Sequence, residues 1–287
     1  MNPLCGLRIG ALAIGLVATA AAAQAQPAGC EPGKLAEKYP TLAGRTLKIG
    51  VDPQTPPYVM RDANNFDQLV GFDADLARAT LDCIGVQHEF FIGGWSGLLP
   101  ALIAGQIDLF WNNLYYTTER AKQVDYVVYM QAGTGALGRA GNPKGIDGMG
   151  DLCGTTVAVG LGTVEEPQVK AEDETCRAAG KDGVTMMTFP DVAAGVRLVQ
   201  GERADIMLYD LALIDALVVG NPSEYGRAFK ILSGFGIGVA VNEKEPELLK
   251  AVAEALTLIQ TSGEQDAIFK RYTIDTALGM PAEVKTQ

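Results

Sequence analysis

Residues Gly94–Arg120 read GWSGLLPALIAGQIDLFWNNLYYTTER, and this stretch joins a helix pattern to a strand pattern with almost no linker. Apolar residues recur at helical spacing over Trp95–Ala104, and Gly105 supplies the left-handed conformation that commonly ends a helix. The largely apolar run Ile107–Trp111 predicts a strand covered on both faces, as in a parallel sheet. A helix followed at once by a buried strand indicates an α/β fold.

Arg120 is a candidate anion-binding residue. After the predicted strand, Asn112–Tyr116 is expected to form a loop, and Thr117 is a suitable N-cap for a helix that places Arg120 in its first turn. A cation in the first turn opposes the helix dipole unless an anion binds at the same place. The alternative is a solvent-exposed arginine paired with Glu119 or Asp125.

The first 25 residues resemble a secretory signal peptide. Arg8 precedes a long apolar run, and Ala23-Gln24-Ala25 is a typical cleavage site. We therefore expect residues 1–25 to be removed and the mature protein to begin at Gln26, in the periplasm. A lipoprotein site at Cys30 is the alternative. No later segment has the roughly 20 apolar residues of a membrane-spanning helix, so we expect a soluble protein.

The charge of the chain argues against one class of partner. It has 23 lysines and arginines against 34 acidic residues, which gives a net charge of −11. Removal of the signal peptide takes away only Arg8, so the mature chain is still more acidic. Nucleic-acid binding depends on neutralising phosphates with basic side chains, and we therefore expect no nucleic-acid partner.

The cysteines predict disulfides. The chain has 5 of them, and Cys5 lies in the expected signal peptide. An even number remains in an oxidising compartment, which favours two disulfides. Four cysteines allow three pairings, and pairing sequence neighbours would keep each bond within one half of the chain. A metal site is the alternative, but the spacing lacks a close pair and only His88 could help; we expect no metal and no cofactor. The four are Cys30, Cys83, Cys153 and Cys176.

Strand and helix patterns alternate along the rest of the chain, which again favours an α/β fold with largely parallel sheets. The expected strands are 47–51, 88–92, 156–159, 184–188 and 204–208, and the expected helices are 72–81, 165–179, 192–200, 246–261 and 265–272.

The second series of elements echoes the first. LKIGVD at Leu47–Asp52 parallels TTVAVG at Thr155–Gly160, the composition becomes rich in glycine after Gln131, and an extended run begins again at Phe235. Two similar lobes with facing loops would bind a ligand between them, and two crossings of the chain would form a hinge. The expected division is 1–25 signal peptide, 26–131 plus 236–287 lobe 1, and 132–235 lobe 2.

The signal peptide, the two lobes and the motifs WSGLLPALIAGQIDL, TTER, VAVGLGT and MLYD together resemble the periplasmic solute-binding proteins of polar amino-acid ABC importers. The similarity extends over essentially the whole mature chain. It implies the type II periplasmic-binding-protein fold (Venus flytrap) with a two-segment hinge. It also implies a monomer that is not an enzyme, captures a small carboxylate-bearing solute such as an amino acid or a derivative, and delivers it to a membrane permease with its ATPase.

The resemblance assigns the two charged ends of such a ligand. The carboxylate-binding arginine of the family falls on Arg120, and the ammonium-binding acid falls on Asp210. A guanidinium clamps a carboxylate bidentately and a carboxylate accepts from an ammonium, so this pair would form a zwitterion receptor from opposite lobes. The alternative for Asp210 is an N-cap of the helix that follows it.

The resemblance also implies further ligand contacts. Asn112, Asn113 and Tyr115 are larger than the Ser, Gly or Thr common at these positions, so we expect a pocket of different shape. The Gly162-Thr163-Val164 loop could bind a carboxylate through its N–H groups, and Val164 removes a hydroxyl donor that is common there. Trp95 would form either a ligand wall or core packing, and Tyr58 could instead be a turn aromatic. The contacts implied in addition to Arg120 and Asp210 are Asp52, Tyr58, Trp95, Asn112, Asn113, Tyr115, Gly162, Thr163 and Val164.

Two other functions remain open at this point. Relatives of this fold have been recruited as cyclohexadienyl or arogenate dehydratases, which need a general acid in the cleft; the candidates are Asp52, Glu165, Glu166 and Asp210. A sensor module acting through a separate receptor is the third possibility. The sequence leaves the ligand itself open, because Asp52 would favour a cationic side chain whereas Tyr58 and its aromatic neighbours would favour an apolar one.

Overall fold

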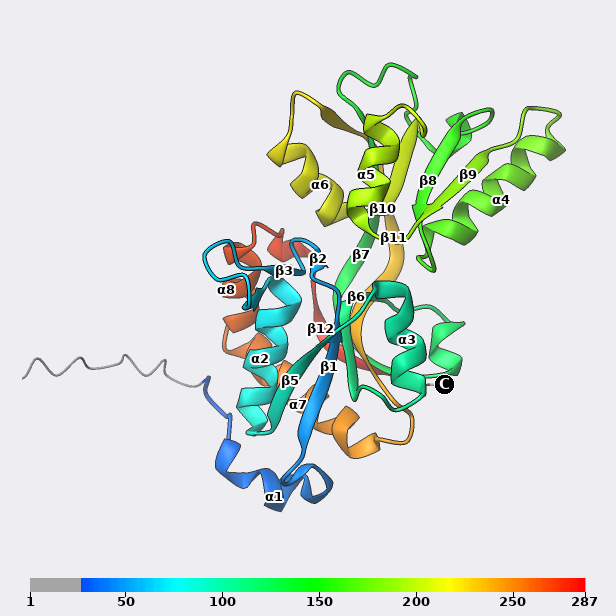
Figure 1. The fold of residues 1–287 in the computed structure, drawn as a ribbon. Coiled ribbons are helices and arrows are strands. Elements are labelled where there is room, and N and C mark those ends of the chain that lie inside the picture. The colour runs from blue at the N-terminus through cyan, green and yellow to red at the C-terminus, as the bar shows by residue number, and fades with distance from the viewer. Residues whose placement is uncertain (1–26, 287) are drawn as a thin grey trace, which may run out of the picture.

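The computed structural model describes residues 27–286, and the expected signal peptide lies outside them (Figure 1). The described helices include none that is both long and apolar enough to span a membrane. Two groups of elements, which we call lobe 1 and lobe 2, are joined by two long strands, β7 (Asp125–Arg139) and β11 (Tyr225–Val241). The expected two-lobed α/β fold is confirmed.

Lobe 1 contains the strands β1 (Thr46–Val51), β5 (Gln87–Ile92), β6 (Leu109–Tyr115) and β12 (Gly279–Lys285), the small sheet of β2 (Gln54–Thr55), β3 (Val59–Arg61) and β4 (Leu69–Val70), and the helices α1 (Leu35–Lys38), α2 (Phe72–Ile84), α3 (Trp95–Ile103), α7 (Pro246–Thr261) and α8 (Glu264–Arg271). Lobe 2 contains β8 (Thr156–Gly160), β9 (Thr185–Phe189), β10 (Ile206–Asp210), α4 (Glu165–Ala178), α5 (Val192–Gln200) and α6 (Leu211–Gly220). Short 3-10 turns occur at Pro32–Lys34, Pro40–Leu42, Arg120–Lys122, Met149–Asp151 and Thr276–Leu278.

The main sheet passes through both lobes in the order β5-β1-β6-β11-β7-β10-β8-β9. Pairing is parallel within each lobe, as expected, whereas β7 and β11 pair antiparallel with their neighbours. Ile237 of β11 lies opposite both Tyr115 and Met130, and Thr134 of β7 lies opposite both Asp210 and Ile231. The carboxyl ends of β6 and β10 are therefore fixed close to the crossing strands.

The region after Trp111 differs from the prediction of a loop. Strand β6 continues to Tyr115, and its two asparagines are buried. The Asn112 side chain accepts from Asp52 N and donates to Thr55 Oγ1, while the Asn113 N–H donates to Asp73. Polar residues can occupy a buried strand when their hydrogen bonds are made, and sequence periodicity does not reveal such partners.

The helix predicted after Thr117 is also wrong. Only the three-residue turn Arg120–Lys122 forms there, because β7 begins at Asp125 and leaves too few residues for an α-helix. Thr117 Oγ1 does accept the Arg120 N–H at 3.2 Å. The helix-dipole argument for Arg120 therefore fails, and the residue lies in the short turn between β6 and β7.

The first part of the glycine-rich segment after Gln131 forms the second half of β7, which ends at Arg139. Its glycines allow α6 to pack directly on the strand: a Cβ on Gly133 would lie 3.0 Å from Leu211 Cδ2, and one on Gly135 would lie 2.9 Å from Ile214 Cβ. Contacts that short require the helix to shift, so the small residues set the distance between α6 and the crossing strand.

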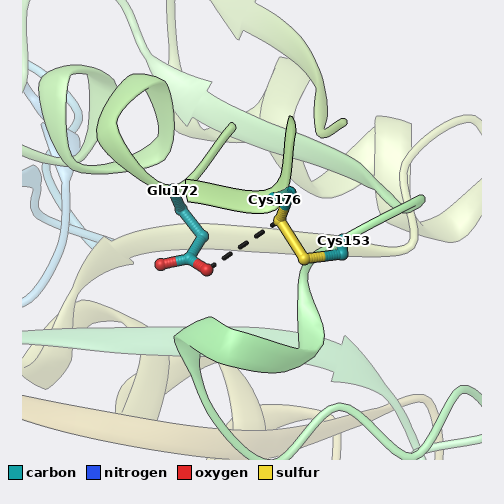
Figure 2. Close-up of side chains that lie close together, drawn as sticks. All are labelled: Cys153, Glu172 and Cys176. Carbon is teal, nitrogen blue, oxygen red and sulfur yellow. Dashed lines mark hydrogen bonds between the residues drawn. A yellow bond between two sulfur atoms is a disulfide. The ribbon is translucent and has the colours of Figure 1, made fainter. Parts of the chain in front are cut away.

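Each lobe contains one disulfide. Cys30 is bonded to Cys83 in lobe 1, and Cys153 to Cys176 in lobe 2. Figure 2 shows that the Glu172 carboxylate lies beside the second bond, with Oε1 3.9 Å from Cys176 Sγ. These three residues lie close enough together to hold a metal ion, but both sulfur atoms are used in the disulfide, and a thiolate is the form that binds metal.

We expect the lobe 1 disulfide to contribute more stability than the lobe 2 disulfide, because it closes 53 residues rather than 23. In the chain-entropy model, the double variant Cys30→Ala/Cys83→Ala loses about 4 kcal/mol of unfolding free energy and Cys153→Ala/Cys176→Ala about 3 kcal/mol. Urea unfolding followed by circular dichroism measures both. A larger loss in the lobe 2 variant would contradict the loop-closure explanation.

Candidate functional site

A small cavity lies between the lobes at the ends of β6 and β10. A second small cavity adjoins it, and Trp95, Thr163 and Tyr209 border both. The lining residues of the first cavity are Trp95, Asn113, Tyr115 and Arg120 from lobe 1 and Thr163, Val164, Glu165, Tyr209 and Asp210 from lobe 2. Most of the expected ligand contacts are thus brought together.

Arg120 connects the two lobes. Its Nη1 donates to Tyr115 O at 2.8 Å, and its Nη2 donates to Gly162 O at 2.9 Å. The guanidinium carbon lies 5.3 Å from the centre of the Trp95 ring, a cation–π contact. Burial lowers the pKa of Arg120, but a guanidinium stays protonated in proteins. It has five N–H donors, so donors remain for an anion in the cavity.

The alternative that pairs Arg120 with Glu119 does not fit this geometry. The Glu119 carboxylate pairs instead with Lys122, at 2.7 Å. The two groups that accept hydrogen bonds from the arginine side chain are neutral carbonyls. They therefore do not neutralise its positive charge. An anion bound in the cavity would therefore meet a partly desolvated cation whose nearby opposite charge is Glu165.

Asp210 is the N-cap of the helix that follows it, and it also borders the cavity. Its Oδ1 accepts the Leu213 N–H at 3.0 Å, which makes it the N-cap of α6. Its Oδ2 accepts from the Tyr115 hydroxyl at 2.7 Å and from the Tyr58 hydroxyl at 3.2 Å. Burial raises the pKa of Asp210 to about 6, while the Leu213 N–H lowers it. The carboxylate borders the cavity but is already well supplied with donors.

Glu165 is a cavity residue that the ligand-site prediction missed. Its side chain is buried, and Oε1 accepts the Thr134 hydroxyl at 2.9 Å. Burial raises its pKa, and Arg120 is among the groups that lower it. The sequence predicts the same role for Glu165 and Glu166, as acids at a helix N-terminus. In the structure, Glu165 borders the cavity, whereas Glu166 pairs with Lys170 outside it.

Asp73 is a second residue that sequence reasoning missed, and it holds Asn113 in place. Its Oδ2 accepts the Asn113 N–H at 2.5 Å and its Oδ1 accepts the Tyr129 hydroxyl at 2.7 Å. Asn113 has a φ of +48°, in the left-handed region that Asn tolerates better than most residues. Its buried Oδ1 has no hydrogen-bond partner in the described part of the chain.

Three other predicted contacts, Asp52, Tyr58 and Asn112, do not line the first cavity and support the residues that do. Both Asp52 oxygens accept backbone N–H groups, from Gln54 and from Trp95 at 3.0 Å each, and Asp52 borders only the second cavity. Tyr58 is fully buried and reaches the site through its hydroxyl. Neither Tyr58 nor Asn112 lines either cavity.

The Gly162-Thr163-Val164 loop offers fewer donors than expected. The Gly162 N–H donates to Glu166 Oε2 at 3.1 Å, and the Thr163 N–H donates to Gly160 O at 3.2 Å. Two of the three N–H groups assigned to a carboxylate are therefore used within the protein. Thr163 and Val164 still border the cavity beside Glu165.

Comparison with known proteins finds a family of solute-binding proteins and individual members that bind amino acids. The family model described as bacterial extracellular solute-binding proteins, family 3, matches residues 47–275. The L-cystine-binding protein TcyJ of Escherichia coli (strain K12) is 29% identical over 231 residues, covering 79% of this chain and 82% of the relative. The arginine-binding protein ArgT of Corynebacterium glutamicum is 28% identical and covers 81% of this chain and 75% of the relative.

Two solved structures are similar over most of their length. An ancestral arginine-binding protein bound to arginine has 32% identity and a TM-score of 0.72, covering 79% of this chain and 97% of that one. An ancestral amino acid-binding protein described as a precursor of cyclohexadienyl dehydratase has 29% identity and a TM-score of 0.69, covering 83% and 98%. The curated relatives named here are binding proteins.

The buried Asp73 carboxyl predicts a pH-dependent stability. Burial raises its pKa from 3.8 to about 7, so between these values the folded protein holds a proton that the unfolded chain has released. Stability therefore falls as pH rises through this window, by up to about 1.4 kcal/mol per pH unit. We expect Asp73→Asn to remove this contribution. Its unfolding free energy relative to wild type should rise from pH 5 to 7 and then level off; a constant difference would contradict the assignment.

Proposed function

This chain belongs to the bacterial extracellular solute-binding proteins of family 3, and we propose that it is the ligand-binding component of an ABC importer for an amino acid or a close derivative. In this proposal the signal peptide is cleaved and the mature protein works in the periplasm as a monomer. It delivers its ligand to a membrane permease and the associated ATPase, and it catalyses no reaction. The named relatives bind cystine and arginine, which supports a polar amino acid as the ligand class.

The observation that carries the proposal is the arrangement of charge around the first cavity. The lining residues include one cation, Arg120, and two buried acids, Glu165 and Asp210. A ligand with a carboxylate beside Arg120 and an ammonium beside the acids would compensate charges at both ends. Exclusion of water between the lobes would strengthen these contacts, because electrostatic interactions are larger in a low-dielectric site.

Lobe closure would follow from contacts with both sides of the cavity. Arg120 and Tyr58 already bond across the lobes, to Gly162 O and to Asp210. A ligand shifts the equilibrium toward the closed form only by its differential affinity for that form. We propose that the lobes divide near residues 131/132 and 235/236, within β7 and β11, and that these strands form the hinge.

A dehydratase is the second candidate function. It is favoured by the similarity to the precursor of cyclohexadienyl dehydratase and by the position of Glu165, a buried carboxyl with a raised pKa beside the cavity. Such a group could act as a general acid. Incubation of the mature protein with prephenate and arogenate, followed by product chromatography, tests this candidate; we expect no turnover.

The importer proposal predicts a strong dependence on Arg120. Calorimetry of the refolded, ligand-stripped mature protein with L-arginine, L-glutamine, L-histidine and L-cystine should detect binding of at least one. We expect Arg120→Ala to weaken that binding by about 3 kcal/mol, roughly 150-fold, because the variant leaves a desolvated carboxylate without its partner.

Lys122→Ala is the matched control, since it removes a nearby cation from the exposed surface outside the cavity. Its affinity should stay within about twofold of wild type. Unchanged affinity in Arg120→Ala, or no binding of any of the four amino acids, would count against the proposal.

A further inference from the structure

The lobe 2 disulfide and Glu172 form a compact group of metal-ligating atoms (Figure 2). Glu172 and Cys176 are four residues apart on α4, so their side chains lie on one face of the helix. Cys153 follows the short turn Met149–Asp151 and is bonded to Cys176 on that face. The two sulfur atoms and a Glu172 oxygen all lie within 4.8 Å of one another. The group lies outside both cavities between the lobes.

Among the described residues, no cation pairs with the Glu172 carboxylate. Both basic residues of α4 pair with other acids, Glu166 and Asp173. The polar contact of Glu172 is with Cys176 Sγ, at 3.9 Å. A disulfide sulfur has no proton to donate, so the carboxylate gains little from this contact. A half-buried carboxylate without a compensating charge is thus held beside two sulfur atoms.

The spacing of these atoms suits a thiophilic cation once the sulfurs are thiolates. Zinc binds cysteine sulfur at about 2.3 Å and carboxylate oxygen at about 2.1 Å, in tetrahedral geometry. Such a site places each sulfur about 3.6 Å from the oxygen and the two sulfurs about 3.8 Å apart. The sulfur–oxygen distance of 3.9 Å between Cys176 and Glu172 is close to that value. The Cys153 and Cys176 Cα atoms are 5.5 Å apart, so side-chain rotation can separate the sulfurs after reduction.

Solvent access leaves room for a fourth ligand. Cys176 is buried, whereas Cys153 and Glu172 are half-buried, so the group is open on one side. Zinc sites with three protein ligands keep a water molecule in the fourth position. Thiolate ligands favour cations such as Zn²⁺, whereas Mg²⁺ and Ca²⁺ prefer oxygen ligands alone. The chemistry of the three side chains therefore selects a thiophilic cation.

We propose that reduction of the lobe 2 disulfide creates a binding site for a thiophilic divalent cation, with Cys153, Cys176 and Glu172 as its three protein ligands. A dithiol reductant gives two electrons and two protons to the disulfide, becomes a disulfide itself and leaves two protein thiols. The cation then displaces one proton from each thiol, and the carboxylate binds in its ionised form. The disulfide and the bound cation therefore exclude each other at this site.

The lobe 1 disulfide lacks the third ligand. Within residues 27–286, no acidic or histidine side chain forms a comparable group with Cys30 and Cys83. Reduction of that pair yields two thiols only, and we expect a lower affinity for zinc there because fewer protein ligands hold the ion. The two cysteine pairs of one chain thus provide an internal comparison, and the inference assigns the site to lobe 2 alone.

The test measures Zn²⁺ binding by the mature protein in its oxidised and reduced forms. Reduction with dithiothreitol, followed by gel filtration under nitrogen, gives the reduced protein, and competition with a chromophoric chelator gives the Kd for Zn²⁺. We expect one Zn²⁺ per reduced chain and no binding by the oxidised chain at the same concentrations. Co²⁺ in place of Zn²⁺ should show thiolate-to-metal charge-transfer absorption, which reports sulfur ligands directly.

Glu172→Gln and Glu174→Gln separate the third ligand from the general charge of the helix. Glu174 is the matched control, because it is an exposed acid on α4 that lies outside the group. We expect Glu172→Gln to weaken Zn²⁺ binding by the reduced protein at least about tenfold, since changes outside the ligand shell alone cost about 10–100-fold. Glu174→Gln should stay within about twofold of wild type. The double variant Cys153→Ser/Cys176→Ser keeps the lobe 1 pair and should lose both the Zn²⁺ site and the Co²⁺ absorption.

Equal Zn²⁺ affinities of reduced Glu172→Gln and reduced wild type would overturn the inference. So would binding by the oxidised wild type, binding retained in the double cysteine variant, or no binding by the reduced wild type. Binding by an unfolded reduced chain gives the first of these results, because it does not depend on Glu172. If circular dichroism shows that oxidised Glu172→Gln fails to fold, Glu172→Asp replaces it, and we expect a smaller decrease because the carboxylate is kept on a shorter side chain.

Discussion

The antiparallel ladder between β7 and β11 is the constraint on which the arrangement of the site depends. These two strands pass through both lobes and hold β6 on one side and β10 on the other. Tyr115 and Asp210 end those flanking strands, so their contact is set by backbone register. Tyr115 and Asp210, which both border the cavity, are therefore placed by hydrogen bonds of the main chain.

Much of the fold followed from periodicity. Helices α5 and α7 have the predicted bounds, and β1, β5, β8, β9 and β10 overlap predicted strands, whereas β12 and the small sheet of β2, β3 and β4 were not predicted. Other errors occur where β6 and β7 meet the interface between lobes. There, asparagines that are buried were predicted to form a loop, and the glycines that let α6 pack closely were noted only as a change in composition. Both patterns reflect contacts with residues distant in sequence, which a local pattern does not contain.

The site was predictable in outline, through the resemblance that placed Arg120 and Asp210 on opposite lobes. Its detail was not. Glu165 and Glu166 are adjacent and chemically alike, yet only Glu165 turns into the cavity. Asp73 lies in the first turn of α2, where an acid is expected because it interacts favourably with the helix dipole. Only the tertiary fold brings it close to the Asn113 N–H. Such roles depend on the orientation of a side chain, which spacing alone leaves undetermined.

The disulfide connectivity has a consequence for how the protein is made. Cys30 is joined to Cys83 and Cys153 to Cys176. For a chain exported from its N-terminus, as proposed above, this is the order in which the four thiols leave the translocation channel. An oxidase that joins each thiol to the next one to appear produces the native connectivity directly. Consecutive pairing then needs no later thiol–disulfide exchange, and the Cys30–Cys83 bond can form before Cys153 and Cys176 have been delivered.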